Sequence, residues 1–183
     1  MSASTDGRTG GHQGRSGQSI GAEVRALVRL ATAEAERRGL PAVEAEHLML
    51  ALLAGTGSTG GTAGTGGAAA VLAAEGLDYD TFARALIAER ENSLRAAGVE
   101  PVPADRLVST GRQSRARFGT SARQALVAAH RVSASHRRHN MRTGDVAAGI
   151  LSSSLGTVPR ALAYAGLDRS RLLQAVVSAT QEA

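Results

Sequence analysis

Apolar residues recur with a helical period once the polar start of the chain has passed. Spacings of i, i+4, i+7 and i+11 place four of them on one helical face: Ile20, Val24, Leu27 and Ala31. Ser19 is a suitable N-cap for this helix, and Gly39 followed by Pro41 is a typical stop. The pattern therefore predicts a first helix from about residue 20 to residue 38.

Three more helices are predicted in the first half. Residues 46–54 are apolar nearly all round, which indicates a buried helix, and residues 68–75 form a short helix that ends at Gly76. Asp78 is expected to cap a longer helix that runs to Ala97. Its buried side is expected to carry Phe82, Leu86 and Ile87.

Three segments lack this periodicity. Residues 1–18 are polar and rich in Gly and Ser, so they cannot bury enough surface to offset their ordering entropy, and we expect a disordered arm. Residues 55–67 have the low complexity of a mobile loop. Residues 98–117 contain several turn signals and are interpreted as a linker.

The second half of the sequence repeats the first. A shift of 98 residues places Phe118 on Ile20 and Leu151 on Leu53, and a shift of 90 places Asp168 on Asp78. Neither half can bury its apolar faces alone, but two together can share one core. We therefore predict one all-α domain over residues 19–181, with eight helices in two pseudo-symmetric four-helix repeats, 19–97 and 118–181.

The composition excludes several kinds of functional site but does not identify the function. All 21 basic residues are Arg, with no Lys and no Cys, which excludes disulfides, thiolate metal sites and a P-loop lysine. Excess Arg suits phosphate binding, but the accompanying excess of Ala and Gly is also typical of a GC-rich genome. No segment resembles a signal peptide or a membrane span, so we expect a cytoplasmic protein without membrane contact, metal or cofactor.

The doubled pattern resembles the N-terminal domain of the Clp ATPases, of the ClpA, ClpB and ClpC type. In that family the second helix of each four-helix repeat commonly opens Thr-Glu-His-Leu-Leu-Leu-Gly-Leu-Leu. The first copy here is Ala45-Glu46-His47-Leu48-Met49-Leu50-Ala51-Leu52-Leu53, and the second begins Thr143-Gly144-Asp145-Val146. The resemblance covers about residues 19–181 and implies a free-standing Clp N-domain, because the missing Lys leaves no nucleotide site.

The resemblance implies a binding site at the start of these second helices. In ClpC-type domains the Glu of each repeat helps bind phosphorylated arginine on tagged substrates. The matching residues are Glu46 beside Ala45 in repeat one, and Gly144 between Thr143 and Asp145 in repeat two. The second copy lacks the carboxylate, and Thr143 is expected to cap the helix. The alternative for Glu46 is a carboxylate that only stabilises the helix start.

The resemblance also implies a groove at the repeat junction, where related domains bind cyclic peptide antibiotics. The matching positions are Phe118 and Arg123, with Arg115 nearby, whereas the family's other aromatic falls at Gly17. The alternative is that Phe118 packs the first turn of its own helix.

Residues 130–142 form the most basic stretch. Its arginines are Arg131, Arg137, Arg138 and Arg142. They suit a phosphate or an acidic partner, or they are a solvated helix end. His136 and His139 are at positions i and i+3, a spacing found in pairs of metal ligands, but no further ligand completes a site.

These observations favour a non-catalytic binding protein of the Clp system. It is expected to recognise peptides, degradation-tagged proteins or adaptors, and to deliver them to a Clp ATPase or act as a decoy for cyclic peptides. No nucleophile elbow or other catalytic constellation is present. The alternative is a DNA-binding regulator that uses residues 130–142 and the N-terminal arm, although no aromatic residue is interleaved for base stacking.

Overall fold

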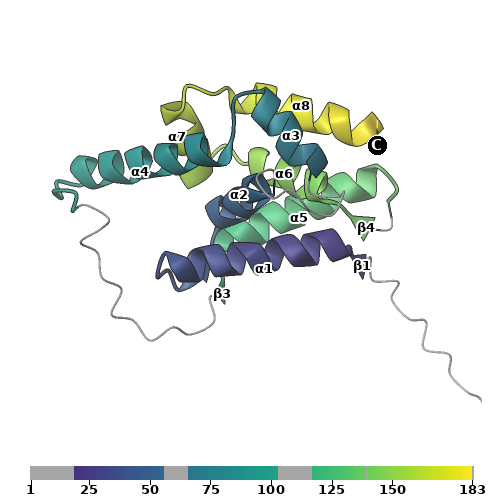
Figure 1. Ribbon diagram of the computed structural model, residues 1–183, viewed down its shortest axis with the longest axis horizontal. Coiled ribbons are helices and arrows are strands. Elements are labelled where there is room, and N and C mark those ends of the chain that lie inside the picture. Colours follow the sequence, from purple (N-terminus) through teal and green to yellow (C-terminus); the bar gives the residue numbers. More distant parts are fainter. Residues whose placement is uncertain (1–18, 56–65, 103–116, 139, 183) are drawn as a thin grey trace, which may run out of the picture.

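The chain folds into a helical domain, described here by a computed structural model (Figure 1). The structure describes residues 19–55, 66–102, 117–138 and 140–182. The elements of the first half are β1 (Ser19–Ile20), α1 (Ala22–Arg37), β2 (Ala42–Val43), α2 (Ala45–Ala54), α3 (Gly66–Ala74) and α4 (Tyr79–Ala96). Those of the second half are β3 (Arg117–Phe118), α5 (Thr120–Ser135), β4 (Asn140–Met141), α6 (Thr143–Leu151), α7 (Thr157–Tyr164) and α8 (Arg169–Glu182). Eight helices over these ranges confirm the predicted all-α class.

The elements of the two halves correspond one to one. Adding 98 to the bounds of α1 gives those of α5, and adding 90 to the start of α4 gives that of α8. The short strands pair reciprocally and in parallel, β1 with β4 and β2 with β3. Because β1 corresponds to β3 and β2 to β4, each pair is the image of the other under a pseudo-twofold operation. Each strand pair therefore joins the segment just before the first helix of one half to the segment just before the second helix of the other half.

One apolar core is shared by both halves. Nearly every residue of α2 and α6 is buried, and these two helices lie in the middle of the molecule (Figure 1). In α1 the buried face includes Val24, Leu27 and Ala31, as the spacing predicts. The fourth helix of each half packs against the third helix of the other, α4 on α7 and α8 on α3 (Figure 1). Over the described ranges, no helix has the length and apolar character needed to cross a bilayer.

Helices α5 and α6 approach each other at Gly149. A Cβ atom added there would lie 2.3 Å from the Ala125 carbonyl oxygen and 2.7 Å from the Ala129 amide nitrogen. Both are backbone atoms, which cannot move aside without shifting α5. The missing side chain of Gly149 therefore sets the spacing of these two helices.

The predicted caps of the fourth helices are confirmed. The Asp78 carboxylate accepts a hydrogen bond from the Thr81 amide at 2.7 Å, and Asp168 accepts one from the Ser170 amide at 2.7 Å. Both bonds satisfy amides that have no partner inside the helix, and the one from Thr81 lowers the pKa of Asp78.

The predicted caps of two other helices are wrong. Residue Ser19 lies with Ile20 in β1, so the first helix begins later and its N-cap is Gly21. The N-cap of α6 is Arg142 rather than Thr143, which is already helical and buried. In both cases pairing between short strands fixes the chain just before the helix, which single-residue cap preferences do not anticipate.

Several further expectations need correction or fall outside the described ranges. Ile87 is 51% exposed rather than buried. The third helix begins at Gly66 instead of Ala68, within the predicted loop, and Arg117 of the predicted linker belongs to β3. Residues 1–18, 56–65 and 103–116 lie outside the described part, so the predicted arm and most of the predicted loop and linker do too.

Candidate functional site

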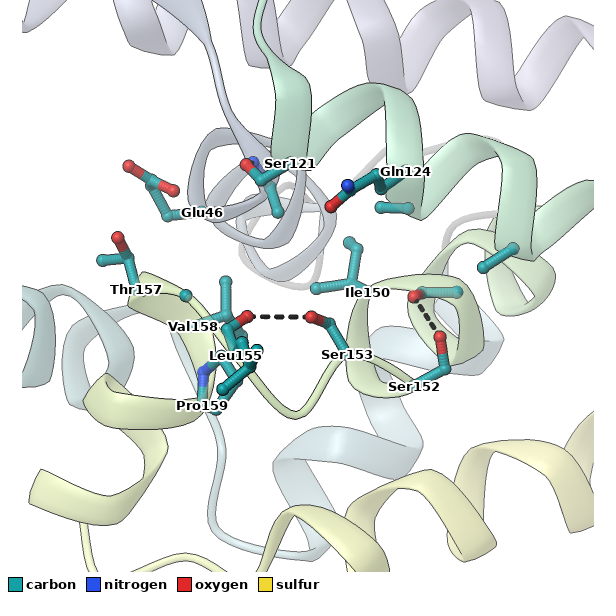
Figure 2. A pocket seen from close by; sticks show the side chains of 15 residues that line it. Glu46, Ser121, Gln124, Ile150, Ser152, Ser153, Leu155, Thr157, Val158 and Pro159 are labelled. Carbon is teal, nitrogen blue, oxygen red and sulfur yellow. Dashed lines mark hydrogen bonds between the residues drawn. The ribbon is translucent and has the colours of Figure 1, made fainter.

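A hollow of about 220 Å³ opens beside Glu46 (Figure 2). We call it the Glu46 hollow. It lies between the start of α2, one face of α5 and the connection from α6 to α7. Its apolar lining includes Ala125, Ile150, Leu155 and Val158, and its polar lining Glu46, Ser121, Gln124, Ser152, Ser153 and Thr157. Both halves of the chain therefore contribute to the site.

The serine hydroxyls of this hollow already donate hydrogen bonds to other groups of the protein. Ser152 donates to the Gly149 carbonyl at 2.7 Å and Ser153 to the Leu155 carbonyl at 2.8 Å (Figure 2). Ser121 donates to the Glu44 carboxylate at 2.5 Å. A hydroxyl has one proton and two lone pairs, so these oxygens can offer a ligand only acceptor capacity.

Glu46 is the one charged residue among the described side chains that line this hollow. It is half-buried in the first turn of α2, and burial is the main cause that raises the pKa of its carboxyl above the ordinary 4.5. Glu44 and Glu89 raise this pKa further, whereas its own backbone amide and Arg38 oppose the rise. The ionised carboxylate is thus incompletely solvated and would gain from a cationic partner.

Glu44 joins the starts of α2 and α5. Its carboxylate accepts from the Ser121 amide at 3.0 Å, and the Ser121 hydroxyl accepts from the Ala45 amide at 2.8 Å. A side chain at Gly119 would collide with that carboxylate. The contact holds α5 against the Glu46 end of α2, so Glu44 positions the hollow without lining it.

A second hollow of about 320 Å³ lies beside the start of α6, where the pseudo-twofold operation places the first. We call it the Gly144 hollow. Its polar and charged lining consists of Glu23, Arg138, Arg142, Thr143 and Thr180. Glu23 takes the place of Ser121 and Gly144 that of Glu46, which makes the two hollows electrostatically different.

A side chain at Gly144 would meet Thr180 of α8 before it could enter the hollow. A Cβ atom at Gly144 would lie 2.3 Å from the Thr180 methyl carbon of α8. Arg138 holds α8 there, because its guanidinium donates to the Thr180 carbonyl and lies 3.7 Å from the buried Asp145 carboxylate. The equivalent of Arg138 in the first half is Leu40, which cannot make this tie.

The predicted site residues are therefore dispersed. Of the first group, Glu46 and Ala45 line the Glu46 hollow, whereas Thr143 and Asp145 are buried at α6, where Asp145 accepts from the Arg142 amide at 2.8 Å. Of the groove residues, Phe118 is half-buried against the core, Arg123 is exposed, and neither lines either hollow; Arg115 lies outside the described ranges.

The predicted basic patch loses one member. Arg131, Arg137 and Arg142 are exposed, but Arg138 turns inward to α8 and Asp145. Among the described residues no group of three His, Asp or Glu side chains is placed to hold a metal ion.

Sequence reasoning missed most of the hollow. No motif or spacing in the sequence marks Gln124, Ser152, Ser153 or Thr157 as binding residues. The repeat offset relates equivalent positions but does not say which helix of one half faces the other. That cross-packing brings α5 to Glu46, and it was not visible in the sequence.

The helical architecture is that of the Clp N-terminal domain. The N-terminal domain of the caseinolytic protease associated chaperone ClpD from Arabidopsis thaliana is similar, with a TM-score of 0.59 and 17% identity over 88% of this chain and 94% of that one. The Hsp104 N-terminal domain from Candida albicans has a TM-score of 0.58 and 11% identity over 86% and 89%. No protein-family profile and no curated protein sequence matches the chain. At these identities the likeness establishes the fold, which is the expected one.

Proposed function

We propose that this chain is a non-catalytic binding module of the Clp type that recognises peptide segments of substrates or adaptors. The observation that carries the proposal is the Glu46 hollow. It combines an apolar lining with a half-buried carboxylate at the position where the resemblance expects a ligand contact. Polar groups that converge on a concavity with apolar side chains in its lining are typical of a ligand site.

The finer proposal concerns its place in the Clp system. Through this site the chain delivers proteins to a Clp ATPase, or competes with that ATPase's own N-domain for them. Sequestration of cyclic peptides directed at ClpC is a variant of the same role, and Phe118 and Arg123 are its candidate contacts. Phe118 is half-buried and Arg123 is exposed, so both keep surface for a ligand.

The test has two arms. The chain is immobilised and Clp subunits and their substrates are captured from the native cytoplasm. Binding to phosphoarginine peptides and to ClpC-directed cyclic peptides is measured by calorimetry. Capture of a Clp subunit or a Clp substrate supports the proposal. Absence of any capture, together with no binding to either ligand, contradicts it.

A further inference from the structure

We infer that the Glu46 hollow binds the unmodified guanidinium of an arginine side chain in a peptide, and that it discriminates against a phosphorylated one. This inference rests on the proposed peptide-binding function and specifies what the site accepts. It concerns the donors and acceptors that the hollow presents.

The charge of the hollow favours a cation. Glu46 contributes a carboxylate, and none of the fifteen described lining residues is basic. A phosphoryl group would add up to two negative charges near that carboxylate, and the described lining residues include no arginine to compensate them. An unmodified guanidinium instead forms a charge-assisted pair with Glu46.

The hydroxyls of the hollow also favour a donor-rich ligand. The oxygens of Ser152 and Ser153 can only accept, because their protons bond the Gly149 and Leu155 carbonyls. A guanidinium has five N–H donors and no acceptor, whereas a phosphoryl group brings only acceptor oxygens at its charged end. Among the described lining side chains, the donors left are the Gln124 amide and the Thr157 hydroxyl, and neither carries a positive charge to balance a phosphoryl group.

The shape of the hollow suits arginine better than a compact cation. Ala125, Ile150 and Val158 offer an apolar lining for a three-carbon stem. Acceptors come from α2 and from the connection between α6 and α7, so they lie on different sides of the hollow (Figure 2). The planar fork of a guanidinium reaches several separate acceptors, whereas an ammonium acts as a point charge.

The experiment compares four peptides that differ at one side chain: arginine, lysine, citrulline and phosphoarginine. Fluorescence anisotropy at pH 7.5 measures their affinity for the full chain. We expect arginine to bind most tightly, and citrulline and phosphoarginine at least about tenfold more weakly, the factor that corresponds to one lost charge-assisted hydrogen bond. Citrulline keeps the shape of arginine but is uncharged, and it has a carbonyl oxygen in place of one NH₂ group of the guanidinium.

Two variants locate the effect. Glu46→Gln is expected to remove the preference for arginine over citrulline. The matched control, Glu91→Gln, alters an exposed carboxylate that pairs with Arg95 on α4 and lines neither hollow, so it should leave all four affinities unchanged. Equal or tighter binding of the phosphoarginine peptide, or a preference that survives Glu46→Gln, overturns the inference. If none of the four peptides binds while the chain still captures Clp subunits or substrates, this inference fails and the proposed function stands.

Discussion

At the scale of single residues, repeat one keeps a charged side chain where repeat two has none. Glu46 and Gly144 occupy equivalent positions in the two repeats. Burial raises the pKa of Glu46, so its ionised form is held at a cost that a cationic ligand can offset. The ionised Glu46 side chain therefore slightly lowers the free energy of unfolding, and it is also the centre of the proposed site.

The first prediction concerns the pH dependence of binding. Arginine stays charged throughout, so affinity for an arginine peptide should fall as the pH is lowered from 7.5 through the raised pKa of Glu46, because a protonated carboxyl no longer pairs with the guanidinium. Anisotropy titrations from pH 7.5 down to the ordinary pKa of 4.5 measure this. The affinity of the Glu46→Gln variant should not change over this pH range. Because the variant keeps Glu44, Glu89 and Arg38, it also tests whether these neighbours cause the pH dependence. A slope retained in that variant would place the titrating group elsewhere.

A second prediction at this scale concerns His47. Its Nδ1 accepts from the Glu44 amide at 2.9 Å, and burial followed by the charge of Arg38 lowers its pKa from 6.5 to about 4. The unfolded chain therefore takes up a proton before the folded one does. Stability is fully present above pH 6.5 and falls as the pH drops towards 4, by up to about 3 kcal/mol.

Urea denaturation at pH 7.5, 6, 5 and 4 measures this loss. His47→Asn keeps an acceptor for the Glu44 amide but cannot bind a proton in this range. The variant should therefore lose less stability between pH 6.5 and 4 than the parent chain. Identical losses in both would show that other groups cause the acid sensitivity.

At the scale of elements, local sequence patterns predict most of the helices, whereas contacts between distant segments determine where some of them begin. The helical periods and the Asp caps of α4 and α8 were predictable because they depend on local spacing and on one side chain bonding a nearby amide. The starts of α1 and α6 were not, because pairing between β1 and β4 acts over 121 residues of sequence. Likewise, only the three-dimensional structure showed that α8 covers Gly144.

The third prediction is that Gly149→Ala destabilises the fold by about 1–3 kcal/mol, because the new methyl group would meet the backbone of α5. Thermal or urea unfolding measures the change. Gly67→Ala is the control: this residue is also helical but a Cβ there meets nothing within 4 Å. Its stability should be unchanged or raised by less than about 1 kcal/mol. Equal effects of the two substitutions would contradict the close approach at Gly149.

The fourth prediction concerns restoration of the missing carboxylate. Gly144→Glu should cost about 1–3 kcal/mol, because its Cβ would collide with the Thr180 methyl carbon. Thr180→Ala removes that methyl, so the double variant should recover part of the loss. A double-mutant cycle in urea measures the coupling between the two positions. Additive effects would show that Thr180 does not limit the space at residue 144.

At the scale of the whole molecule, a pseudo-symmetric fold carries two different hollows. The sequence predicted the doubled architecture and the asymmetry between Glu46 and Gly144, since both follow from aligning the repeats. It did not predict that α5 and the α6–α7 connection complete the Glu46 hollow, because that depends on how one half packs across the other. The central claim is that one hollow per chain binds a basic peptide side chain.

The most direct test of that claim is an NMR titration of the isotopically labelled chain with an arginine peptide. We predict saturable shift changes for one peptide per chain, concentrated at Glu46, Ser121, Gln124, Ser153 and Thr157. Signals of Thr143, Gly144 and Thr180 in the Gly144 hollow should stay in place. Changes centred on the Gly144 hollow, or equal changes at both hollows, would contradict the claim.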